Sequence, residues 1–201
     1  MRVRLENIGH VFDGSAALFD DLSHDFLPGH KYALVGPSGS GKSTLLSIIA
    51  GWVPPTAGKV TLDDVERICW VFQNPHGVAS RTALDHVVLP LLAQGLRRAA
   101  ADAKALELMA SVDLAHIAER RFRELSGGEA QRLMLVRAIA ARPDVLLVDE
   151  PTAQLDPRTA ASVNGTLQQI SADGTIIIVA THDPRTRDAC TDILDLEMIS
   201  R

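Results

Sequence analysis

The stretch that decides the fold is Gly36-Pro37-Ser38-Gly39-Ser40-Gly41-Lys42-Ser43-Thr44. It follows the apolar run 32–35 and precedes the apolar helical pattern of residues 45–50. The order of strand, glycine-rich loop and helix matches a phosphate-binding loop, in which a glycine and four further residues precede Gly-Lys-Ser/Thr. Backbone N–H groups in such a loop and at the following helix N-terminus form a nest for anions. We expect Lys42 to reach the β- and γ-phosphates of a nucleotide and the Ser43 hydroxyl to bind Mg²⁺.

The composition predicts a globular chain without a membrane-spanning segment. The 201 residues are 46% hydrophobic and 22% charged, which suffices for one domain with a full core. The net charge of −5 argues against a general surface for nucleic acid or anionic lipid. No apolar window approaches the ~18 residues of a membrane span, and residues 1–7 lack the apolar core of a signal peptide. Cys69 and Cys190 are isolated, as expected of incidental thiols in a reducing compartment.

Apolar patterns predict alternating strands and helices. Continuous apolar runs predict buried parallel strands at 32–35, 68–72, 145–148 and 175–180, and a last edge strand at 193–196. The remaining strands are expected near residues 3–8, 22–27 and 60–62. Helices are expected at 45–50, 82–95 with an interruption at Pro90, 97–112, 114–120, 126–141 and 158–170.

Polar side chains follow several of the predicted buried strands. Asp149 and Glu150 end the run 145–148, and the carboxyl ends of parallel strands meet at one edge of a sheet. Asp149 there can hold Mg²⁺, directly or through water, and Glu150 can orient and polarise an attacking water. Gln73 and His182 also follow strands, but such residues taken alone more often make local hydrogen bonds in a loop.

Two further features each admit two interpretations. Ser126 is a good N-cap for the helix to about 141, and Glu129, three residues on, completes a capping box. The run Ser126-Gly127-Gly128 can equally form a second anion nest. Phe12, in the early loop 9–14, is either an exposed aromatic that stacks on adenine or an ordinary core residue.

Taken together, these residues resemble the nucleotide-binding subunit of ABC transporters over nearly the whole chain. The family's motifs occur in their usual order: Walker A at 36–44, the Q-loop at Gln73, the Leu-Ser-Gly-Gly signature at 125–132, Walker B at 145–150, the D-loop at Gln154-Leu155-Asp156 and the switch histidine at His182. Because all six motifs occur in the family's order, the resemblance favours functional roles for Gln73 and His182 over the local hydrogen bonds that each residue alone would suggest.

The resemblance implies the fold. It is an α/β fold with a P-loop core of mostly parallel sheet, a small antiparallel β lobe and an α-helical insertion. It implies one domain over residues 1–201, with the core and β lobe in about 1–80 and 122–201 and the helical subdomain in about 81–121.

The resemblance also implies a mechanism. Two copies, identical or different, would pair head to tail, with ATP between the Walker A of one and the signature residues of the other, Ser126, Gly127, Gly128 and Glu129. Glu150 would polarise the water, and His182 would contact the γ-phosphate. Gln73 would sense Mg²⁺ and connect to a separate transmembrane permease subunit. Phe12 falls where the family places an adenine-stacking aromatic. The subunit would lie on the cytoplasmic face of the cell (inner) membrane, with no nucleic-acid partner.

The chain departs from the family's usual pattern at two places. The segment between Gly58 and Gln73 is short, and Ala153 precedes Gln154 in the D-loop where the family often has serine. Three segments have amino-acid sequences similar to those of the lipoprotein-releasing and macrolide-exporting branch: the signature, Thr181-His182-Asp183 and residues 82–90.

Two other classes of function compete with a transporter motor. The first is a non-transport ATPase of the same superfamily, either a chromosome-organising or DNA-repair head or a ribosome-associated factor. A DNA-repair head would need long heptads, and residues 82–120 are too short and contain Pro90. A ribosome-associated factor usually carries two such domains. The second class is a nucleotide-binding module that does not hydrolyse ATP, against which Lys42, Glu150 and His182 argue.

Overall fold

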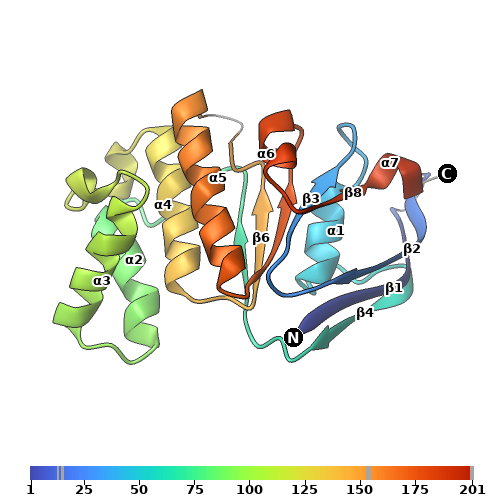
Figure 1. The fold of residues 1–201 in the computed structure, drawn as a ribbon, viewed down its shortest axis with the longest axis horizontal. Helices are drawn as coiled ribbons and strands as arrows, with labels where there is room; N and C mark the ends of the chain where they lie inside the picture. The colour runs from blue at the N-terminus through green and yellow to red at the C-terminus, as the bar shows by residue number, and fades with distance from the viewer. Residues whose placement is uncertain (13, 15, 153–154, 200–201) are drawn as a thin grey trace.

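A five-stranded parallel sheet forms the centre of the molecule (Figure 1). The computed structural model describes residues 1–12, 14, 16–152 and 155–199. The strand order is β5-β6-β7-β3-β8, with bounds Ile68–Val71 (β5), Val145–Asp149 (β6), Ile176–Ala180 (β7), Lys31–Val35 (β3) and Asp192–Asp195 (β8). Every neighbouring pair is parallel. This confirms the predicted mostly parallel core.

Helices cover both faces of this sheet, and the side chains of each strand alternate between them. Leu146 and Ile177 lie in the core cluster under α4 (Gly127–Ala140) and α5 (Pro157–Ala172). Leu147 and Ile178 lie in the second cluster, with α1 (Lys42–Ile49). The short helix α6 (Pro184–Asp188) follows β7 and lies beside α5 (Figure 1). Because both faces are buried, the central strands are apolar throughout.

A three-stranded antiparallel sheet packs against the α1 side. Its order is β2-β1-β4, with bounds Ala17–Phe26 (β2), Arg2–Val11 (β1) and Ala57–Asp63 (β4). Phe19 and Phe26 from β2 join Leu45 of α1 in one core cluster. The small antiparallel β lobe is therefore confirmed.

The helical insertion lies at the opposite end of the molecule from this lobe (Figure 1). It contains α2 (Ala83–Ala93), α3 (Arg98–Ala110) and two 3₁₀ turns, η1 (Ala115–Ile117) and η2 (Phe122–Glu124). Val87 of α2 and Met109 of α3 share a buried cluster with Leu133 of α4. Among the residues described, no helix is long and apolar enough to cross a bilayer.

Two expectations about this insertion were wrong. Pro90 does not interrupt α2, because the buried residues Val87 and Leu91 around it keep the helix packed despite the lost hydrogen bond. Residues 114–120 form only the turn η1. The carbonyl groups of Ala118 and Arg120 in this segment accept hydrogen bonds from the first N–H groups of α2, so they are not used in a helix of their own.

Two expectations about strands also need correction. Strand β5 lies at the edge of the sheet, so Ile68, Cys69 and Trp70 are only half-buried and Val71 alone is fully buried. The last strand ends at Asp195, and Leu196 begins α7 (Leu196–Ile199). Leu196 is fully buried because it joins the cluster under α1 and the antiparallel sheet.

The bulge between β1 and β4 requires a glycine. Gly58 has φ of 75°, and an added Cβ would overlap the carbonyl oxygens of Glu6 and Asn7. We expect Gly58→Ala to lower the free energy of unfolding by roughly 2–4 kcal/mol, since overpacking and positive-φ strain each cost about 1–3 kcal/mol. The matched control is Gly165→Ala on α5, where nothing lies within 4 Å of the added Cβ. It should be neutral or stabilise by up to about 1 kcal/mol in urea titrations. Equal effects of the two changes would contradict this account.

Lys31 is a charged residue in the buried face of β3. It is 1% exposed, and no carboxylate among the described residues pairs with it. Burial lowers its pKa, so the folded state disfavours the ammonium form at all pH values below the unfolded pKa of about 10.4. We expect Lys31→Met to raise stability at pH 7 by about 1 kcal/mol or more, roughly 2–4 °C in Tm. The gain should shrink as pH rises toward 10.4, because the wild-type penalty then disappears. Thermal melts across this range test it, and a gain that does not change with pH would contradict it.

Candidate functional site

A cleft of about 750 Å³ opens at the carboxyl edge of the parallel sheet. Most of the residues predicted from the sequence line it. The lining consists of Phe12, Leu18, Ser38, Gly39, Gly41, Lys42, Ser43, Thr44, Gln73, Asp149, Glu150 and His182. The cleft therefore gathers residues from the loop after β3 and from the ends of β1, β5, β6 and β7.

The loop between β3 and α1 forms one wall. Gly36, Gly39 and Gly41 have φ of 146°, 83° and 91°, backbone conformations that residues other than glycine rarely adopt. Gly41 lies at the N-cap of α1, so the N-terminal N–H groups of the helix face the loop. Lys42 Nζ donates hydrogen bonds to the carbonyl oxygens of Gly36 at 2.7 Å and Pro37 at 2.9 Å. The ammonium is thus held directly over the loop.

A hydroxyl and a carboxylate meet on the floor of the cleft. Ser43 Oγ donates to Asp149 Oδ2 at 2.7 Å. Burial raises the pKa of Asp149, and the Glu150 charge adds to this, while the Ser43 hydrogen bond and Lys42 oppose it. Both groups offer oxygen ligands of the kind that Mg²⁺ prefers. The described residues contain no group of three or more His, Cys, Asp or Glu able to hold a metal, so a bound Mg²⁺ would need further ligands from substrate and water.

Glu150 and His182 form a pair across the ends of β6 and β7. His182 Nδ1 lies 2.7 Å from Glu150 Oε1, and the His182 N–H lies 3.4 Å from Oε2. The Glu150 side chain is only 10% exposed, whereas that of His182 is 70% exposed. Glu150 has φ of 49°, an uncommon conformation held by its N–H, which donates to the Ala180 carbonyl at 2.9 Å. This turn directs the carboxylate toward the cleft instead of solvent.

Aromatic and amide side chains complete the rim. Phe12 is 49% exposed and packs edge-on against His10 at 4.7 Å between ring centroids, so it is not an ordinary core residue. Gln73 is exposed and follows β5 by two residues. Leu18 was missed by the sequence analysis. It lies on β2 close to Gly41, and strand alternation next to the buried Phe19 was the signal that could have placed it here.

The predicted signature residues do not line this cleft. Ser126 caps α4, accepting the Glu129 N–H at 3.3 Å and donating to Glu129 Oε2 at 2.8 Å. The Ser126 N–H also donates to Glu129 Oε2 at 2.7 Å, which is the main cause that lowers the pKa of Glu129. The capping box is therefore present. Gly127 and Gly128 begin α4 beyond it and lie outside the cleft.

The D-loop region is described only in part. Ala153 and Gln154 lie outside the described residues. Asp156 caps α5 by accepting from the Arg158 and Thr159 N–H groups at 3.0 and 3.2 Å. It does not line the cleft either.

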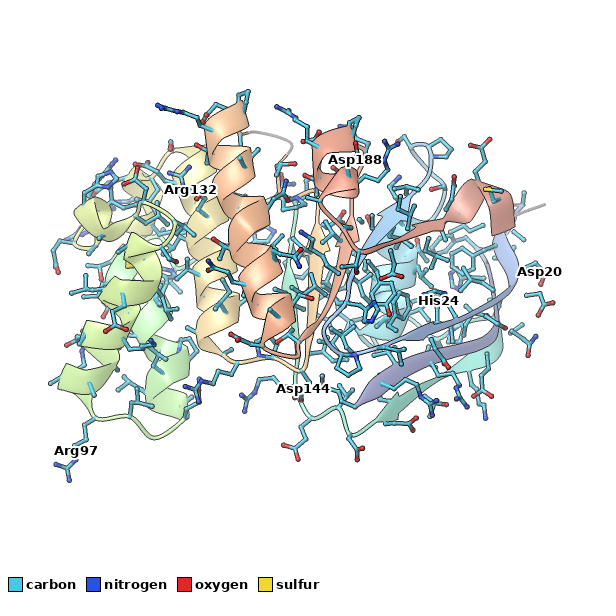
Figure 2. All side chains as sticks on the ribbon, in the orientation of Figure 1. Asp20, His24, Arg97, Arg132, Asp144 and Asp188 are labelled. Carbon is cyan, nitrogen blue, oxygen red and sulfur yellow. The ribbon has the colours of Figure 1, made fainter. Side chains whose placement is uncertain are left out.

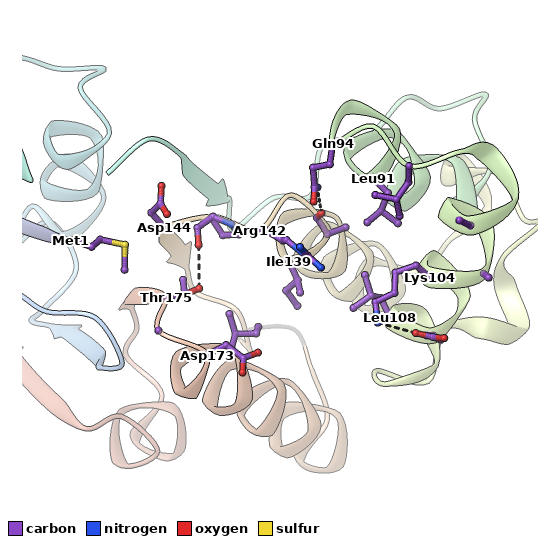
Figure 3. Close-up of a pocket in the computed structure, with 18 residues that line it drawn as sticks. Met1, Leu91, Gln94, Lys104, Leu108, Ile139, Arg142, Asp144, Asp173 and Thr175 are labelled. Atoms are coloured by element: carbon purple, nitrogen blue, oxygen red, sulfur yellow. Dashed lines mark hydrogen bonds and ion pairs between the residues drawn. The ribbon is translucent and has the colours of Figure 1, made fainter. Parts of the chain in front are cut away.

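A larger cavity, of about 920 Å³, lies elsewhere (Figure 3). Figure 2 places Arg132, the last residue of the signature, and Asp144, which lines this cavity, at opposite ends of the core. Its polar groups pair locally: Gln94 Nε2 donates to the Ala140 carbonyl at 2.6 Å, and Thr175 Oγ1 to that of Pro143 at 3.1 Å. None of the predicted motif residues lines it.

The comparison with known families agrees with this geometry. The sequence profile described as "ABC transporter" matches residues 19–153. The chain belongs to the ABC transporter family. A Rhodospirillum rubrum relative named "Lipoprotein-releasing system ATP-binding protein LolD 1" is 39% identical, over 90% of this chain and 89% of the relative. A Mycobacterium bovis relative, called an uncharacterized ABC transporter ATP-binding protein, is 38% identical over 88% of this chain. This chain spans 58% of that relative's length.

Solved ABC cassettes share the fold closely. One is a dimeric ATP-binding cassette in a post-hydrolysis state bound to ADP and Pi, with a TM-score of 0.86 and 30% identity, covering 96% of this chain and 93% of that one. A second dimeric bacterial ABC transporter cassette has a TM-score of 0.83 at 29% identity, covering 96% and 94%. The parallel sheet, antiparallel lobe and helical insertion are thus those of the ABC ATPase fold.

The cap of the family's signature helix contributes to stability. We expect Ser126→Ala to lower the free energy of unfolding by about 1 kcal/mol, because it removes the acceptor of the Glu129 N–H. Ser126→Thr keeps the hydroxyl and should lose only a small part of this. Urea titrations of the isolated chain measure both, and equal losses in the two variants would show that the hydroxyl is not what stabilises the helix.

Proposed function

We propose that this chain binds ATP, hydrolyses it to ADP and phosphate, and drives a membrane ABC transporter by closure of two such subunits. The observation that carries the proposal is the convergence of Lys42, Ser43, Asp149, Glu150 and His182 on one cleft. Together they offer a phosphate nest, metal ligands and a base at the same place.

The proposed nucleotide site follows from the loop geometry. The N–H groups of residues 36–44 surround the phosphates, and Lys42 exchanges its two carbonyl partners for the β- and γ-phosphate oxygens. Phe12 offers an exposed aromatic face at the rim for the adenine ring. ADP and Pi bound to the related cassette support a nucleotide as the ligand.

Mg²⁺ fits the floor of the cleft. Ser43 and Asp149 would hold it, directly or through water, and Gln73 lines the same cleft. The ion would neutralise negative charge on the phosphates. Asp149 accepts the Ser43 hydroxyl hydrogen, which holds both oxygen ligands side by side before any nucleotide enters.

The proposed chemistry is attack of water on the γ-phosphate. Glu150 orients the water and accepts its proton. His182 binds the Glu150 carboxylate through Nδ1, which leaves the exposed remainder of its ring for the γ-phosphate. The contact fixes Glu150 in place, so His182 serves both as a phosphate contact and as a positioning group.

A second subunit, identical or different, would complete the site. Ser126, Gly127, Gly128 and Glu129 lie outside the cleft of their own chain, so they are free to close on the nucleotide of a partner. The dimeric cassettes among the solved structures support this arrangement. Asp156 of the D-loop would lie at the same interface.

A separate transmembrane permease is the proposed second partner. The exposed Trp52 packs on the half-buried Trp70 at 5.0 Å between ring centroids, and Trp70 packs on Phe72 at 4.9 Å. Trp70 and Phe72 border a groove of about 500 Å³. Gln73 directly follows this stack, and Gln131 Nε2 on α4 donates to the Phe72 carbonyl at 3.1 Å. A permease segment seated in the groove would thus touch both the Q-loop and the signature helix. The subunit would lie on the cytoplasmic face of the cell (inner) membrane, without nucleic acid.

We propose that residues 1–201 form one domain with two parts. About 1–80 and 122–201 form the catalytic core and β lobe, and about 81–121 form the helical subdomain.

Relatives carrying the lipoprotein-releasing name are 36–41% identical to this chain, against 33% for one named for methionine import. These values favour the lipoprotein-releasing branch.

The structure gives the competing functions less support. Helices α2 and α3 have 11 and 13 residues, too short for the coiled coil of a DNA-repair head. A binding module without hydrolysis would not need a base held in a strained turn, as Glu150 is.

Replacing the proposed base tests the function. Glu150→Gln should lower the ATPase rate by about 100-fold or more while ATP still binds, because it removes the proton acceptor and keeps the shape. ATP should then trap a dimer, visible as a doubled mass by light scattering. Wild-type hydrolysis by this variant would contradict the assigned role.

Two control variants separate binding from closure. Lys42→Ala should lose ATP binding, since it removes the charge at the β- and γ-phosphates. Glu150→Gln combined with Ser126→Arg should bind ATP and remain monomeric, because the new side chain blocks the partner's nucleotide. A trapped dimer in this double variant would place the interface elsewhere.

A further inference from the structure

An antiparallel contact joins the segment that follows the Q-loop to the segment that precedes the signature. Residues 79–82 pair with residues 121–123 through a β-bridge and through backbone hydrogen bonds of 2.9 and 3.3 Å. The first segment comes shortly after Gln73 in the chain, and the second leads into the signature at 125–132. Two motifs that lie far apart in the sequence are therefore connected directly at this contact.

His86 of α2 touches both of these neighbourhoods. The residue is buried, with 4% of its surface exposed. The Val78 N–H donates to His86 Nε2 at 2.9 Å, and the imidazole packs against the Phe122 ring at 5.2 Å between centroids. The Phe122 ring also packs closely on the chain after the Q-loop, because a Cβ added to Gly77 would lie 2.5 Å from it. One side chain thus holds the chain on either side of the contact.

The hydrogen bonds of His86 fix which ring nitrogen carries the hydrogen. Nδ1 lies 2.7 Å from the Thr82 carbonyl oxygen, which can only accept, so Nδ1 is protonated. The Val78 N–H can only donate, so Nε2 is unprotonated. Both nitrogen atoms are therefore used by a neutral ring. A second proton on Nε2 would face the Val78 N–H and break that bond.

The surroundings of the ring favour this neutral form. Burial lowers the pKa of His86, and the positive charges of Arg137 and Arg81 lower it further. The Thr82 carbonyl and the Asp85 carboxylate act in the opposite direction, but the pKa remains below its ordinary value of about 6.5. The ring is therefore neutral at pH 7, as the bond from Val78 requires.

We propose that His86 is a positioning residue for ATP hydrolysis, whose neutral imidazole holds the Q-loop in a fixed place relative to the signature helix. The inference rests on the proposed ATPase function. His86 does not line the nucleotide cleft, whereas Gln73 does, so we infer that His86 acts through Gln73.

The Q-loop is tied to the signature helix on both sides of Gln73. On the side before it, Gln131 Nε2 of α4 donates to the Phe72 carbonyl at 3.1 Å. On the side after it, the bond from Val78 to His86 does the same through α2, which packs against α4 in one buried cluster. Loss of the Val78 bond leaves only the first tie, so Gln73 and the signature helix can then move independently.

Removing the ring nitrogen atoms tests the proposal in the full chain. His86→Leu keeps an apolar side chain but cannot accept the Val78 N–H. We expect kcat for ATP to fall by about tenfold, since an unreplaced buried hydrogen bond is worth about that much. The Kd for ATP, measured by calorimetry without Mg²⁺, should change by less than about twofold, because His86 is outside the cleft. His116→Leu is the matched control at an exposed position of the helical subdomain and should change neither constant.

A conservative variant separates positioning from simple packing. His86→Gln has an amide oxygen that reaches as far from Cβ as Nε2 and can accept the Val78 N–H. Its kcat should return to within about threefold of the wild-type value. Nitrogen NMR of the wild-type imidazole at pH 7 should show a protonated Nδ1 and an unprotonated Nε2. The opposite tautomer, or no recovery of kcat in His86→Gln, would overturn the proposal.

A double variant tests whether the effect passes through the Q-loop. In a Gln73→Ala background, His86→Leu should lower kcat by no more than about twofold, because residues that act through one another are not additive. A full tenfold loss in this background would overturn the proposal. Wild-type kcat in the single variant His86→Leu would overturn it too. An inactive wild-type chain would instead contradict the proposed function, so the two failures are distinguishable.

Discussion

The parallel pairing of β3, β7 and β6 is the constraint on which the site depends. The strands run in the same direction, so the loop after β3 and the residues after β6 and β7 leave the sheet at one edge. Backbone bonds continue the ladder past the strand ends, from the Thr181 N–H to Leu34 and from the Glu150 N–H to Ala180. These two bonds set the positions of His182 and Glu150 relative to the phosphate loop.

The same edge gives two neighbouring acids different environments. Asp149 ends β6, is held by the Ser43 hydroxyl and has a pKa raised by burial. Glu150, one residue on, turns through a positive φ and binds the His182 imidazole instead. Adjacent carboxylates with different partners can take different roles, here a metal ligand and a base. If β6 continued as a straight strand, the Glu150 side chain would point to the opposite face of the sheet from Asp149. The positive-φ turn at Glu150 is therefore needed to form the site.

The sequence predicted the parts of the fold that depend on local pattern and failed where tertiary context decides. The glycine-rich loop, the strand-end acids and the Ser126–Glu129 capping box depend on residues close in sequence, and the structure has all of them. Apolar content did not reveal that β5 is an edge strand, because half-buried aromatic residues that stack at the sheet edge, Trp70 with Trp52 and Phe72, give the same pattern as a fully buried strand. The effect of Pro90 depended on packing against α4. Leu18 could be placed only once β2 was known to pass Gly41.

Lys31 illustrates the remaining gap between pattern and structure. At the start of an apolar strand a lysine is read as the solvent-facing end of that strand, yet the helices α5 and α6 cover this end. Only the packed structure shows that its ammonium is buried beside Asn164, from which a chain of hydrogen bonds runs through Thr186 and Thr152 to Asp183. That chain of hydrogen bonds is oriented, with every donor directed at Asp183, so its open end at Asn164 can only accept. A pattern of apolar and polar residues along the chain gives no sign of such contacts, because they join residues far apart in the sequence.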